Sequence, residues 1–351
     1  MAQKVTIRDI AEKTGTSVTS VHRAIYGGKG ISQKLREKIL FEVERSNYQM
    51  DEAASMLRRR QFRITVLLPE AAGQERFYFR GLWDGIYKGT RELQKNKVEV
   101  TFVETKHGVS RMAEDLERLY DETDESLNGL VTVCDDAESS SWLQRFMKRG
   151  TRVALIDRGV EIENLCCCME VSSRDMGNLA VHMMRFLTGR EKEGMLVLIN
   201  GPETRFSYRV YADTVEKRVR EQLPNLEMTV LDGYDIERGP EELERLLGKG
   251  NVRGVIASCA RGTYWACETL QRLQMADPPH LVGADVFEEL TPFFENGILE
   301  ATVYQSHREH GEKALRILYD SLVNPYAAAE RTGVPAIPVG LILRENYKYY
   351  L

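Results

Sequence analysis

The stretch VTIRDIAEKTGTSVTSVHRAIYGGKG (residues 5–30) contains two short helical patterns separated by a glycine. In the first pattern, Thr6 precedes Asp9 at the spacing of a capping box, which marks the start of a helix. Gly15 then permits a sharp turn, and Ser17 can cap the second helix. Two short helices joined by a tight turn with glycine predict a helix-turn-helix unit.

The second helix, expected over about 18–25, has different chemistry on its two sides. One side carries an apolar stripe of Val18, Val21, Ala24 and Ile25. The opposite side carries Thr19 and Arg23, with His22 on its flank. Small side chains near a helix start let the backbone approach base edges, and an arginine fork matches guanine in the major groove. An ordinary solvated face with one cation is the alternative.

A third helix is expected in SQKLREKILFEVERSNY (residues 32–48), capped at Ser32. Its inward-facing residues are Leu35, Ile39, Leu40 and Val43. Three small helices provide a minimal core. The following residues 50–62 place a narrow apolar strip that includes Leu57 before three consecutive arginines. A plain linker would have little reason to carry that strip.

The net charge of −5 is unevenly divided along the chain. Residues 1–63 hold 13 Lys and Arg against 7 Asp and Glu, whereas the remainder holds 35 against 46. A small basic segment joined to a large acidic body suggests a polyanion-binding head on a body that does not itself bind the polyanion. Chance clustering of charges is the alternative.

Length and composition exclude several classes of protein. A chain of 351 residues with 42% hydrophobic residues predicts two or three globular domains. Since there is neither a long apolar run nor the apolar core of a signal peptide, we expect a cytoplasmic protein without a membrane partner. The six cysteines lack the paired spacing of a zinc site, and the triplet at 166–168 is interpreted as small packing side chains. No metal and no cofactor are expected.

From Ile64 onward, short apolar runs alternate with amphipathic helical stretches. The first series of runs is ITVLL, VEVTFV, GLVTV and RVALI, and the second is CCCMEV, MLVLIN, LEMTVL, VRGVIAS and HLVGAD. This rhythm predicts an α/β body of two lobes, each a doubly wound parallel sheet covered by helices.

Ligands of open α/β sheets bind beyond the carboxyl ends of the strands, so the loops there are the places to search. These loops carry groups that can make two hydrogen bonds at once, which suits neighbouring hydroxyls: Asp157, Arg158, Arg209, Asp285 and Gln305. Tyr78, Phe79 and Tyr234 can stack on the apolar face of a sugar ring. Helix capping and surface ion pairing are the alternative roles for the charged residues.

Residues 5–60 resemble the DNA-binding headpiece and hinge of the LacI/GalR family of bacterial transcription regulators. The resemblance implies a second helix in the major groove and a hinge helix that pairs across a homodimer and inserts Leu57 into the minor groove, kinking the DNA. It implies base contacts from Val18, Thr19 and Arg23. The complete set expected to contact palindromic double-stranded operator DNA is Thr6, Ser17, Val18, Thr19, His22, Arg23, Tyr26, Leu57 and Arg58.

The headpiece also departs from that family. His22 stands where members usually have serine, and Tyr26 stands where they usually have asparagine. Both positions lie near the phosphate backbone in the family, and the proline common before the hinge is absent around Met50. The operator sequence is therefore not inferred from a relative.

The body resembles the regulatory core of the same family through LIDR, GPETRFSYR, GAD and IPVGLILREN. The stretches FYFRGLWDGIYKGTRELQ and ENGILEATVYQSHREHGEKAL are similar to ribose-type periplasmic sugar-binding proteins. The resemblance implies a carbohydrate effector. The expected effector-binding residues are Tyr78, Phe79, Asp157, Arg158, Arg209, Tyr234, Ser258, Asp285 and Gln305. Ser258 stands where relatives usually have asparagine, which weakens the case for an ordinary hexose or pentose as the effector.

The expected domains are a headpiece (1–49), a hinge helix or linker (50–62) and an effector-binding core (63–351). The core divides into an N-lobe of about 63–160 plus 289–324 and a C-lobe of about 161–288 plus 325–351, with crossovers near 160, 288 and 324. The tail adds no leucine heptad, which favours a homodimer over a tetramer.

Together these features predict an effector-controlled, sequence-specific DNA-binding regulator that acts as a repressor. Two headpieces bind two half-sites, and an effector in the cleft changes the separation of the lobes. The alternatives are a regulator with a non-sugar effector and a solute-binding protein, which the body alone would favour. An enzyme is disfavoured, because a phosphate-binding glycine loop, metal-ligand spacing and a nucleophile elbow are all absent.

Overall fold

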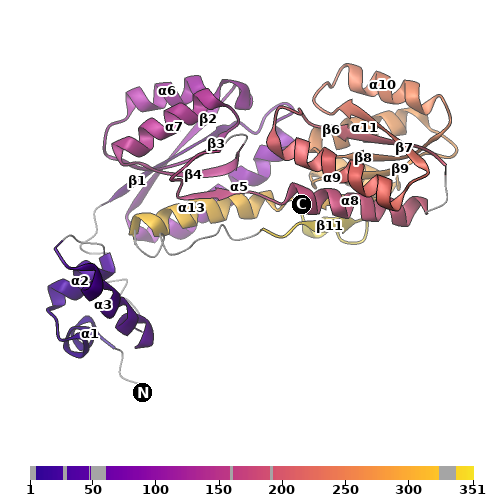
Figure 1. Ribbon diagram of the computed structural model, residues 1–351. Helices are drawn as coiled ribbons and strands as arrows, with labels where there is room; N and C mark the ends of the chain where they lie inside the picture. Colours follow the sequence, from indigo (N-terminus) through magenta and orange to yellow (C-terminus); the bar gives the residue numbers. More distant parts are fainter. Residues whose placement is uncertain are drawn as a thin grey trace.

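A small helical unit, called the headpiece here, precedes a core of two α/β lobes in the computed structural model (Figure 1). The structure describes residues 5–26, 30–46, 48, 61–158, 161–189, 193–323 and 337–351. Residues 50–60 of the expected hinge helix, which include Leu57 and Arg58, lie outside the described residues.

The headpiece contains three helices that begin where the sequence predicts. They are α1 (Ile7–Thr14), α2 (Val18–Tyr26) and α3 (Gln33–Arg45). The capping box is formed, since the Thr6 N–H donates to Asp9 Oδ2 at 2.7 Å. Gly15 ends α1 with a φ of +67°, a left-handed conformation that suits glycine. The hydroxyls of Ser17 and Ser32 cap α2 and α3.

Among the described residues of the headpiece, the buried apolar core consists of Ile10, Ala11, Val21, Ala24, Ile25 and Ile39. Arg36 of α3 donates to the backbone carbonyls of Arg23 and Ala24 at 3.2 and 3.3 Å, and thereby holds the end of α2. Val18, which the helical wheel places on the apolar stripe, is 42% exposed. A wheel gives the direction of a side chain but not its position along the axis, and Val18 stands at the first residue of α2.

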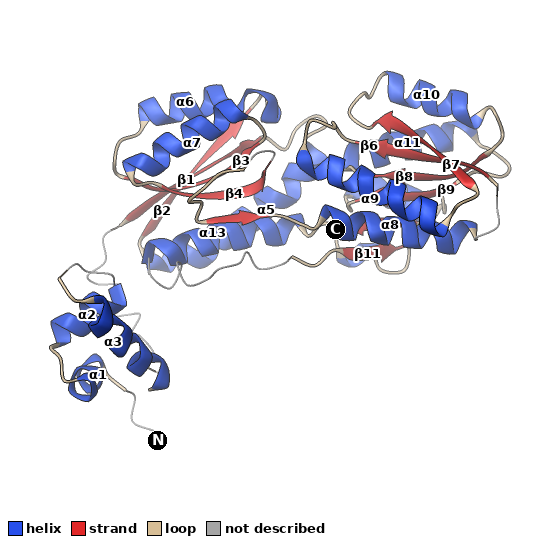
Figure 2. Ribbon diagram, in the orientation of Figure 1, coloured by secondary structure: helices blue, strands red, loops and turns tan. Residues whose placement is uncertain are grey.

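The N-lobe is built on a parallel sheet in the order β2-β1-β3-β4-β5. The strands are β1 (Phe62–Pro69), β2 (Val98–Thr105), β3 (Leu127–Cys134), β4 (Arg152–Arg158) and β5 (Cys167–Met169). One face is covered by α5 (Arg76–Leu93) and α13 (His307–Val323), and the other by α6 (Met112–Glu122) and α7 (Ala137–Arg149) (Figures 1 and 2). Coverage on both faces explains the continuous apolar runs of β1 and β3.

The C-lobe repeats this design in the order β11-β10-β9-β8-β6-β7, and only β11 is antiparallel to its neighbour. The strands are β6 (Gly194–Asn200), β7 (Leu226–Asp232), β8 (Val252–Ala257), β9 (His280–Ala284), β10 (Ala301–Tyr304) and β11 (Gly340–Leu343). The helices are α8 (Ser173–Thr188), α9 (Phe206–Gln222), α10 (Arg238–Leu247), α11 (Ala260–Leu273) and α12 (Thr291–Glu295). Short 3₁₀ helices cover Gln94–Asn96, Gly108–Arg111, Glu288–Leu290 and Tyr347–Tyr349.

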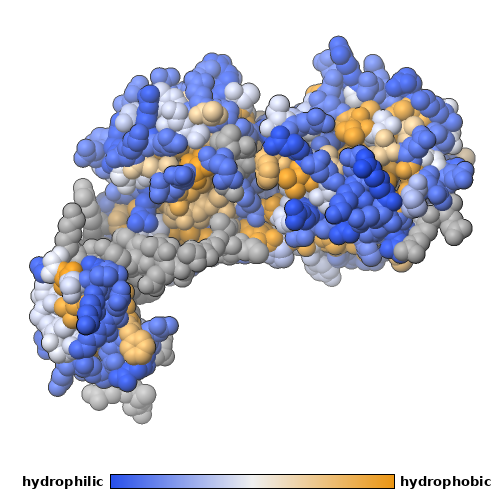
Figure 3. Space-filling model, in the orientation of Figure 1, coloured by the Kyte–Doolittle hydropathy of each residue, from blue (hydrophilic) through white to orange (hydrophobic). Residues whose placement is uncertain are grey.

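Each lobe has its own apolar interior. One buried cluster fills the N-lobe, and two clusters lie on the opposite faces of the C-lobe sheet. The outward faces of α6 and α10 are largely hydrophilic (Figure 3). Within the part of the chain that the structure describes, no helix is both long and apolar enough to cross a membrane.

The first crossing between the lobes comes later than the predicted residue 160. Cys167–Met169, which the sequence pattern assigns to the second series of strands, instead forms β5 and pairs with β4. The chain leaves the N-lobe only after Glu170, where α8 begins to pack on the C-lobe sheet. Cys167 and Cys168 are buried in the N-lobe core, which confirms their interpretation as packing residues.

The other two crossings are also later than predicted. Ala301–Tyr304, interpreted from the sequence as a loop, is β10 of the C-lobe sheet, so the second crossing falls at residues 305–306 rather than near 288. Ile337 still packs in the N-lobe core, so the third crossing lies between it and β11 rather than near 324. In the first two cases, a short strand completes the sheet before the chain leaves it.

Candidate functional site

A cavity of about 390 Å³ lies between the two lobes. It is lined by the carboxyl ends of strands β3, β4 and β5 from the N-lobe and β8, β9 and β10 from the C-lobe, together with the first turns of α5, α8, α9 and α11. This is the place where ligands of open α/β sheets bind, and the volume suits a small molecule. A cavity therefore lies at the strand ends where the sequence predicts the effector site.

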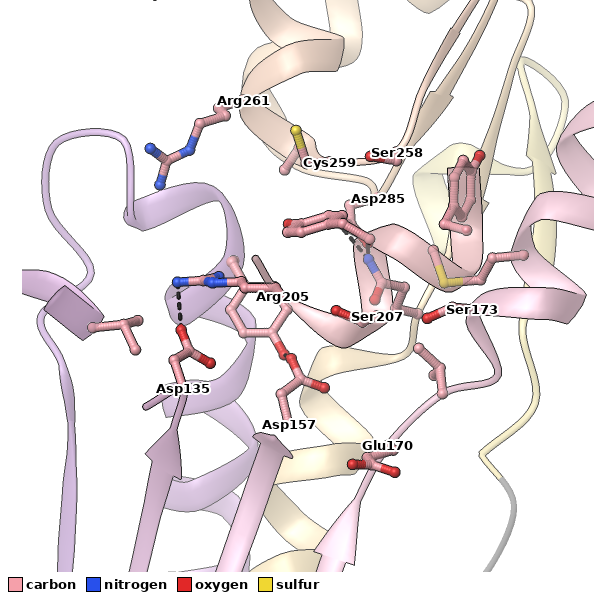
Figure 4. A pocket seen from close by; sticks show the side chains of 18 of the residues that line it. Asp135, Asp157, Glu170, Ser173, Arg205, Ser207, Ser258, Cys259, Arg261 and Asp285 are labelled. Carbon is pink, nitrogen blue, oxygen red and sulfur yellow. Dashed lines mark hydrogen bonds and ion pairs between the residues drawn. The ribbon is translucent and has the colours of Figure 1, made fainter. Parts of the chain in front are cut away.

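Two aspartates occupy matching positions on opposite sides of the cavity. Asp157 stands at the end of β4 and Asp285 directly follows β9, which is the equivalent strand of the other sheet. Their φ angles are +56° and +68°. Left-handed backbone is uncommon outside glycine but tolerated by aspartate, so the same local geometry is built twice. Both side chains line the cavity (Figure 4).

The Asp285 carboxylate is held by two neighbours. Gln305 Nε2 donates to both of its oxygens, at 3.1 and 3.2 Å. His307 Nε2 lies 3.1 Å from Oδ1, a close contact at ion-pair distance that does not have hydrogen-bond geometry. The side chains of Asp285 and His307 are almost fully buried, so this polar group is fixed before any ligand arrives.

On the N-lobe side, the Tyr78 hydroxyl donates to the Asp157 carboxylate. Burial raises the pKa of Asp157 to about 6, and the hydrogen bond from Tyr78 opposes that rise. Burial also raises the pKa of Tyr78, and the charge of Asp157 adds to this effect. Tyr78 and Asp157 are thus brought together as the sequence predicts, although the tyrosine hydroxyl is engaged with the acid.

Arginines of the C-lobe pair with acids of the N-lobe across the cavity. Arg205, at the start of α9, lies 2.5 Å from Asp135 at the end of β3 (Figure 4). Arg261 of α11 lies 3.0 Å from Glu75, which precedes α5. These pairs join the two walls of the cavity directly.

Tyr234 belongs to this arginine network. Its hydroxyl accepts a hydrogen bond from Arg205 at 3.2 Å and lies 3.1 Å from the hydroxyl of Tyr208. The Arg261 guanidinium lies 3.9 Å above its ring. Tyr234 therefore lines the cavity, and one face of its ring is already occupied by a cation.

Of the remaining predicted effector residues, Phe79 and Ser258 also line the cavity. Ser258 Oγ donates to Asn200 Oδ1 at 2.8 Å and accepts from the Gly201 N–H, so its hydrogen bonds are used within the C-lobe. Arg209 is exposed on α9 and is not among the cavity residues, and the side chain of Arg158 lies outside the described residues.

Sequence reasoning missed Glu75, Asp135, Glu170, Arg205, Tyr208 and Arg261, which all line the cavity. A signal for Arg205 was present. The pentapeptides RFYFR (76–80) and RFSYR (205–209) begin the equivalent helices α5 and α9. In the first, Arg76 pairs with Glu289 of the C-lobe at 3.0 Å. Aligning the repeats indicates Arg205, not Arg209, as the arginine that reaches the opposite lobe.

In the headpiece, the exposed side of α2 carries Val18, Thr19, His22 and Arg23. Thr6 and Ser17 are exposed, and their hydroxyls are engaged in helix caps. The side chain of Tyr26 lies outside the described residues. Within the described ranges, no cluster of three or more His, Cys, Asp or Glu side chains could hold a metal ion.

Comparison with known proteins identifies the family of the core. The chain matches the periplasmic binding protein domain over residues 66–324. It is 26% identical over 132 residues to the ribose operon repressor of Haemophilus influenzae, a match that covers 38% of this chain and 37% of that protein.

Solved structures share the architecture. The lac repressor dimer bound to operator and the anti-inducer ONPF is similar over 97% of this chain and 98% of its own, with a TM-score of 0.57 and 20% identity. A putative LacI transcriptional regulator from Bacteroides fragilis has a TM-score of 0.68 at 16% identity, over 83% of this chain and all of its own. A transporter solute-binding protein from Bacillus halodurans with bound myo-inositol has a TM-score of 0.67 at 16% identity, over 83% of this chain and 97% of its own.

These matches confirm the predicted two-lobed fold with its helical headpiece, and the predicted resemblance to LacI-type regulators. The chain belongs to the periplasmic binding protein domain family.

Proposed function

We propose that the protein is a sequence-specific DNA-binding transcription regulator, acting as a repressor, whose core binds a carbohydrate effector. The observation that carries the proposal is that one chain combines a helix-turn-helix unit with a two-lobed core around a cavity lined by both charged and aromatic side chains. The lac repressor, which resembles nearly the whole chain, supports the same combination. The uneven charge, basic in residues 1–63 and acidic beyond, agrees with it.

In this proposal, α2 lies in the major groove. Thr19 and Arg23 face outward from the headpiece core and contact base edges, while Val18 supplies an apolar contact beside them. Two headpieces of a homodimer read the two half-sites of a palindrome. The hinge segment, including Leu57 and Arg58, contacts the minor groove between them.

The cavity supports a carbohydrate as effector. Paired acceptors and donors such as Asp285 with Gln305 suit neighbouring hydroxyl groups, and the rings of Tyr78, Phe79 and Tyr234 supply apolar surface. The ribose operon repressor and the myo-inositol-bound protein support the same ligand class. An effector that prefers one arrangement of the lobes shifts the spacing of the headpieces, and linkage requires DNA to change effector affinity by the same factor.

DNA binding is tested by selecting duplexes from a random pool with the full chain. We expect a palindromic motif to be enriched. Arg23→Ala should cost about 1–3 kcal/mol and relax the preference at one base pair of each half-site. Arg8→Ala removes an equal charge from an exposed position on α1 and is the matched control. Failure to enrich any motif would reject the regulator, and equal losses for both variants would reduce Arg23 to a phosphate contact.

Effector binding is tested by thermal shift with D-ribose, D-arabinose, D-galactose and myo-inositol. A ligand of the folded core raises its melting temperature, and Asp285→Asn should remove that response. A solute-binding protein is the second candidate, favoured by the fold of the Bacillus halodurans neighbour. Sugar binding without selection of any DNA motif would favour that candidate over the regulator.

A further inference from the structure

His307 is the first residue of α13, and it contacts both lobes at the place where the chain crosses between them. Its ring lies 4.3 Å from the ring of Tyr78 in the N-lobe, centroid to centroid. Its Nε2 lies 3.1 Å from Asp285 Oδ1 in the C-lobe. Because Tyr78 donates to Asp157, His307 stands between the two aspartates of the cavity without lining the cavity itself.

The backbone of His307 is fixed to the N-lobe by the close crossing of α5 and α13. A Cβ added at Gly85 would lie 1.9 Å from the Arg308 carbonyl oxygen, and one added at Gly311 would lie 2.3 Å from the Leu82 carbonyl oxygen. The backbones of α5 and α13 are therefore in direct contact, and this close packing prevents one helix from shifting along the other. Lys88 and Glu312 form an ion pair across the same crossing at 2.8 Å.

Asp285, in contrast, is fixed to the C-lobe. Its N–H donates to the Val303 carbonyl at 3.0 Å, which ties it to β10, and Gln305 holds its carboxylate. Between Gln305 and His307, Ser306 adopts a φ of +56°. A change in lobe arrangement must therefore alter the distance between His307 and Asp285.

We infer that His307 is a positioning residue for Asp285: it orients the carboxylate toward the effector only while the lobes keep the arrangement seen here. The inference rests on the proposed effector function and deepens it. A carboxylate oriented by both lobes binds hydroxyl groups best in one arrangement, so His307 makes effector affinity depend on lobe position. Gln305 alone, which follows β10, would orient Asp285 in any arrangement.

Three substitutions at one position separate this role from simple packing. His307→Phe keeps a ring but removes the nitrogen, whereas His307→Gln keeps a nitrogen at about the same reach. His310→Phe is the matched control, because His310 is similarly buried one turn further along α13 and forms no ion pair among the described residues, whereas His307 Nε2 lies 3.1 Å from Asp285 Oδ1.

We expect His307→Phe to weaken binding of the stabilising sugar from the four-sugar screen roughly tenfold, as loss of a close polar contact beside a buried carboxylate does. His307→Gln should restore affinity to within about threefold, and His310→Phe should leave it unchanged. Equal affinities for wild type and His307→Phe would overturn the inference. Equal losses for His307→Phe and His310→Phe would show that only packing matters.

The crystal structure of His307→Phe without ligand tests the same inference independently of the effector. We expect the Asp285 side chain to leave its position beside Gln305 in this variant and to keep it in His307→Gln. An unchanged Asp285 in His307→Phe contradicts the inference. If wild type binds none of the four sugars, the proposed effector class fails, while this structural result still decides the role of His307.

Discussion

The two lobes share one topology but present different chemistry to the cavity between them. At three equivalent strand ends, the N-lobe carries Asp135, Asp157 and Glu170, whereas the C-lobe carries Ser258, Asp285 and Gln305. The described arginines of the cavity, Arg174, Arg205 and Arg261, all belong to the C-lobe. One wall is thus acidic and the other basic, and two of these arginines pair across the gap.

The two copies of this framework have therefore kept one feature of the cavity in common and changed another. The paired aspartates at the ends of β4 and β9 keep the geometry of the repeat. The residues around them have diverged into complementary charges, which favour contact between the lobes. Partly buried pairs of this kind are worth more than exposed ones, because water screens them less.

We predict the largest change in stability for one of two phenylalanines at equivalent positions of the repeated pentapeptide. Phe77 of the N-lobe is 4% exposed and packs into a C-lobe core cluster, with its ring 4.4 Å from that of Phe287. Phe206 of the C-lobe is 58% exposed. Phe77→Ala should lower the free energy of unfolding by about 3 kcal/mol, and Phe206→Ala by less than about 0.5 kcal/mol.

Urea unfolding followed by circular dichroism measures both variants. Similar values for the two would show that the lobes are held together by something other than the Phe77 contact. Because Phe77 and Phe206 are the same residue type at the same repeat position, the comparison isolates the contact between lobes from the identity of the side chain.

The next prediction compares the loss of sugar affinity on substitution of the two cavity aspartates, Asp285 and Asp157. Asp285→Asn should weaken sugar binding about 100-fold, since it changes a buried carboxylate held by Gln305 and His307. Asp157→Asn should cost about tenfold or less at pH 5, because burial raises the pKa of Asp157 to about 6 and its carboxyl is then mostly protonated, as the neutral amide of asparagine is. Isothermal titration at pH 5 measures both variants, and a larger loss for Asp157→Asn than for Asp285→Asn would contradict this ranking.

Local sequence patterns predicted most of the fold because helix caps and strand runs are local. Thr6 with Asp9, Ser32 and the apolar runs of β1 and β3 all lie where their patterns indicate. Crossings between lobes are not local. Whether Cys167–Met169 pairs with β4 or starts a new sheet depends on spatial neighbours, and the short run fits both.

The candidate site was predictable in its location and only partly in its membership. Asp157, Asp285 and Gln305 follow strands, so topology places them at the cavity. Arg205 and Asp135 are 70 residues apart and meet only because the lobes face each other. Arg205 precedes the first residue of α9, whereas Arg209 lies four residues further along the helix axis and is exposed.

The third expected effect tests the charged contact between the walls. Arg205→Gln leaves Asp135 without its partner in a place where burial already raises the pKa of that carboxyl. We expect stability to fall by about 1–2 kcal/mol, and the double variant with Asp135→Asn to recover part of the loss, since no unpaired charge then remains. Urea unfolding of the two single variants and the double variant measures this coupling. Additive losses would mean that the two residues do not interact.

The smallest predicted effect is the contribution of Asp157 to the pH dependence of stability. An aspartate in an unfolded chain titrates near 3.9, whereas burial raises the pKa of Asp157 to about 6. Between these values the folded state binds more protons, so its stability should fall as the pH rises from about 4 to 6 and then level off.

The fall due to Asp157 should be on the order of 1–2 kcal/mol, because the side chain is partly exposed to the cavity. Asp157→Asn should remove it. Tyr78→Phe should extend it above pH 6, since the lost hydrogen bond is the one that opposes the rise in the Asp157 pKa. Urea unfolding at half-unit steps from pH 4 to pH 8 decides the matter: parallel curves for wild type and Asp157→Asn would show that this carboxyl titrates alike in the folded and unfolded chain.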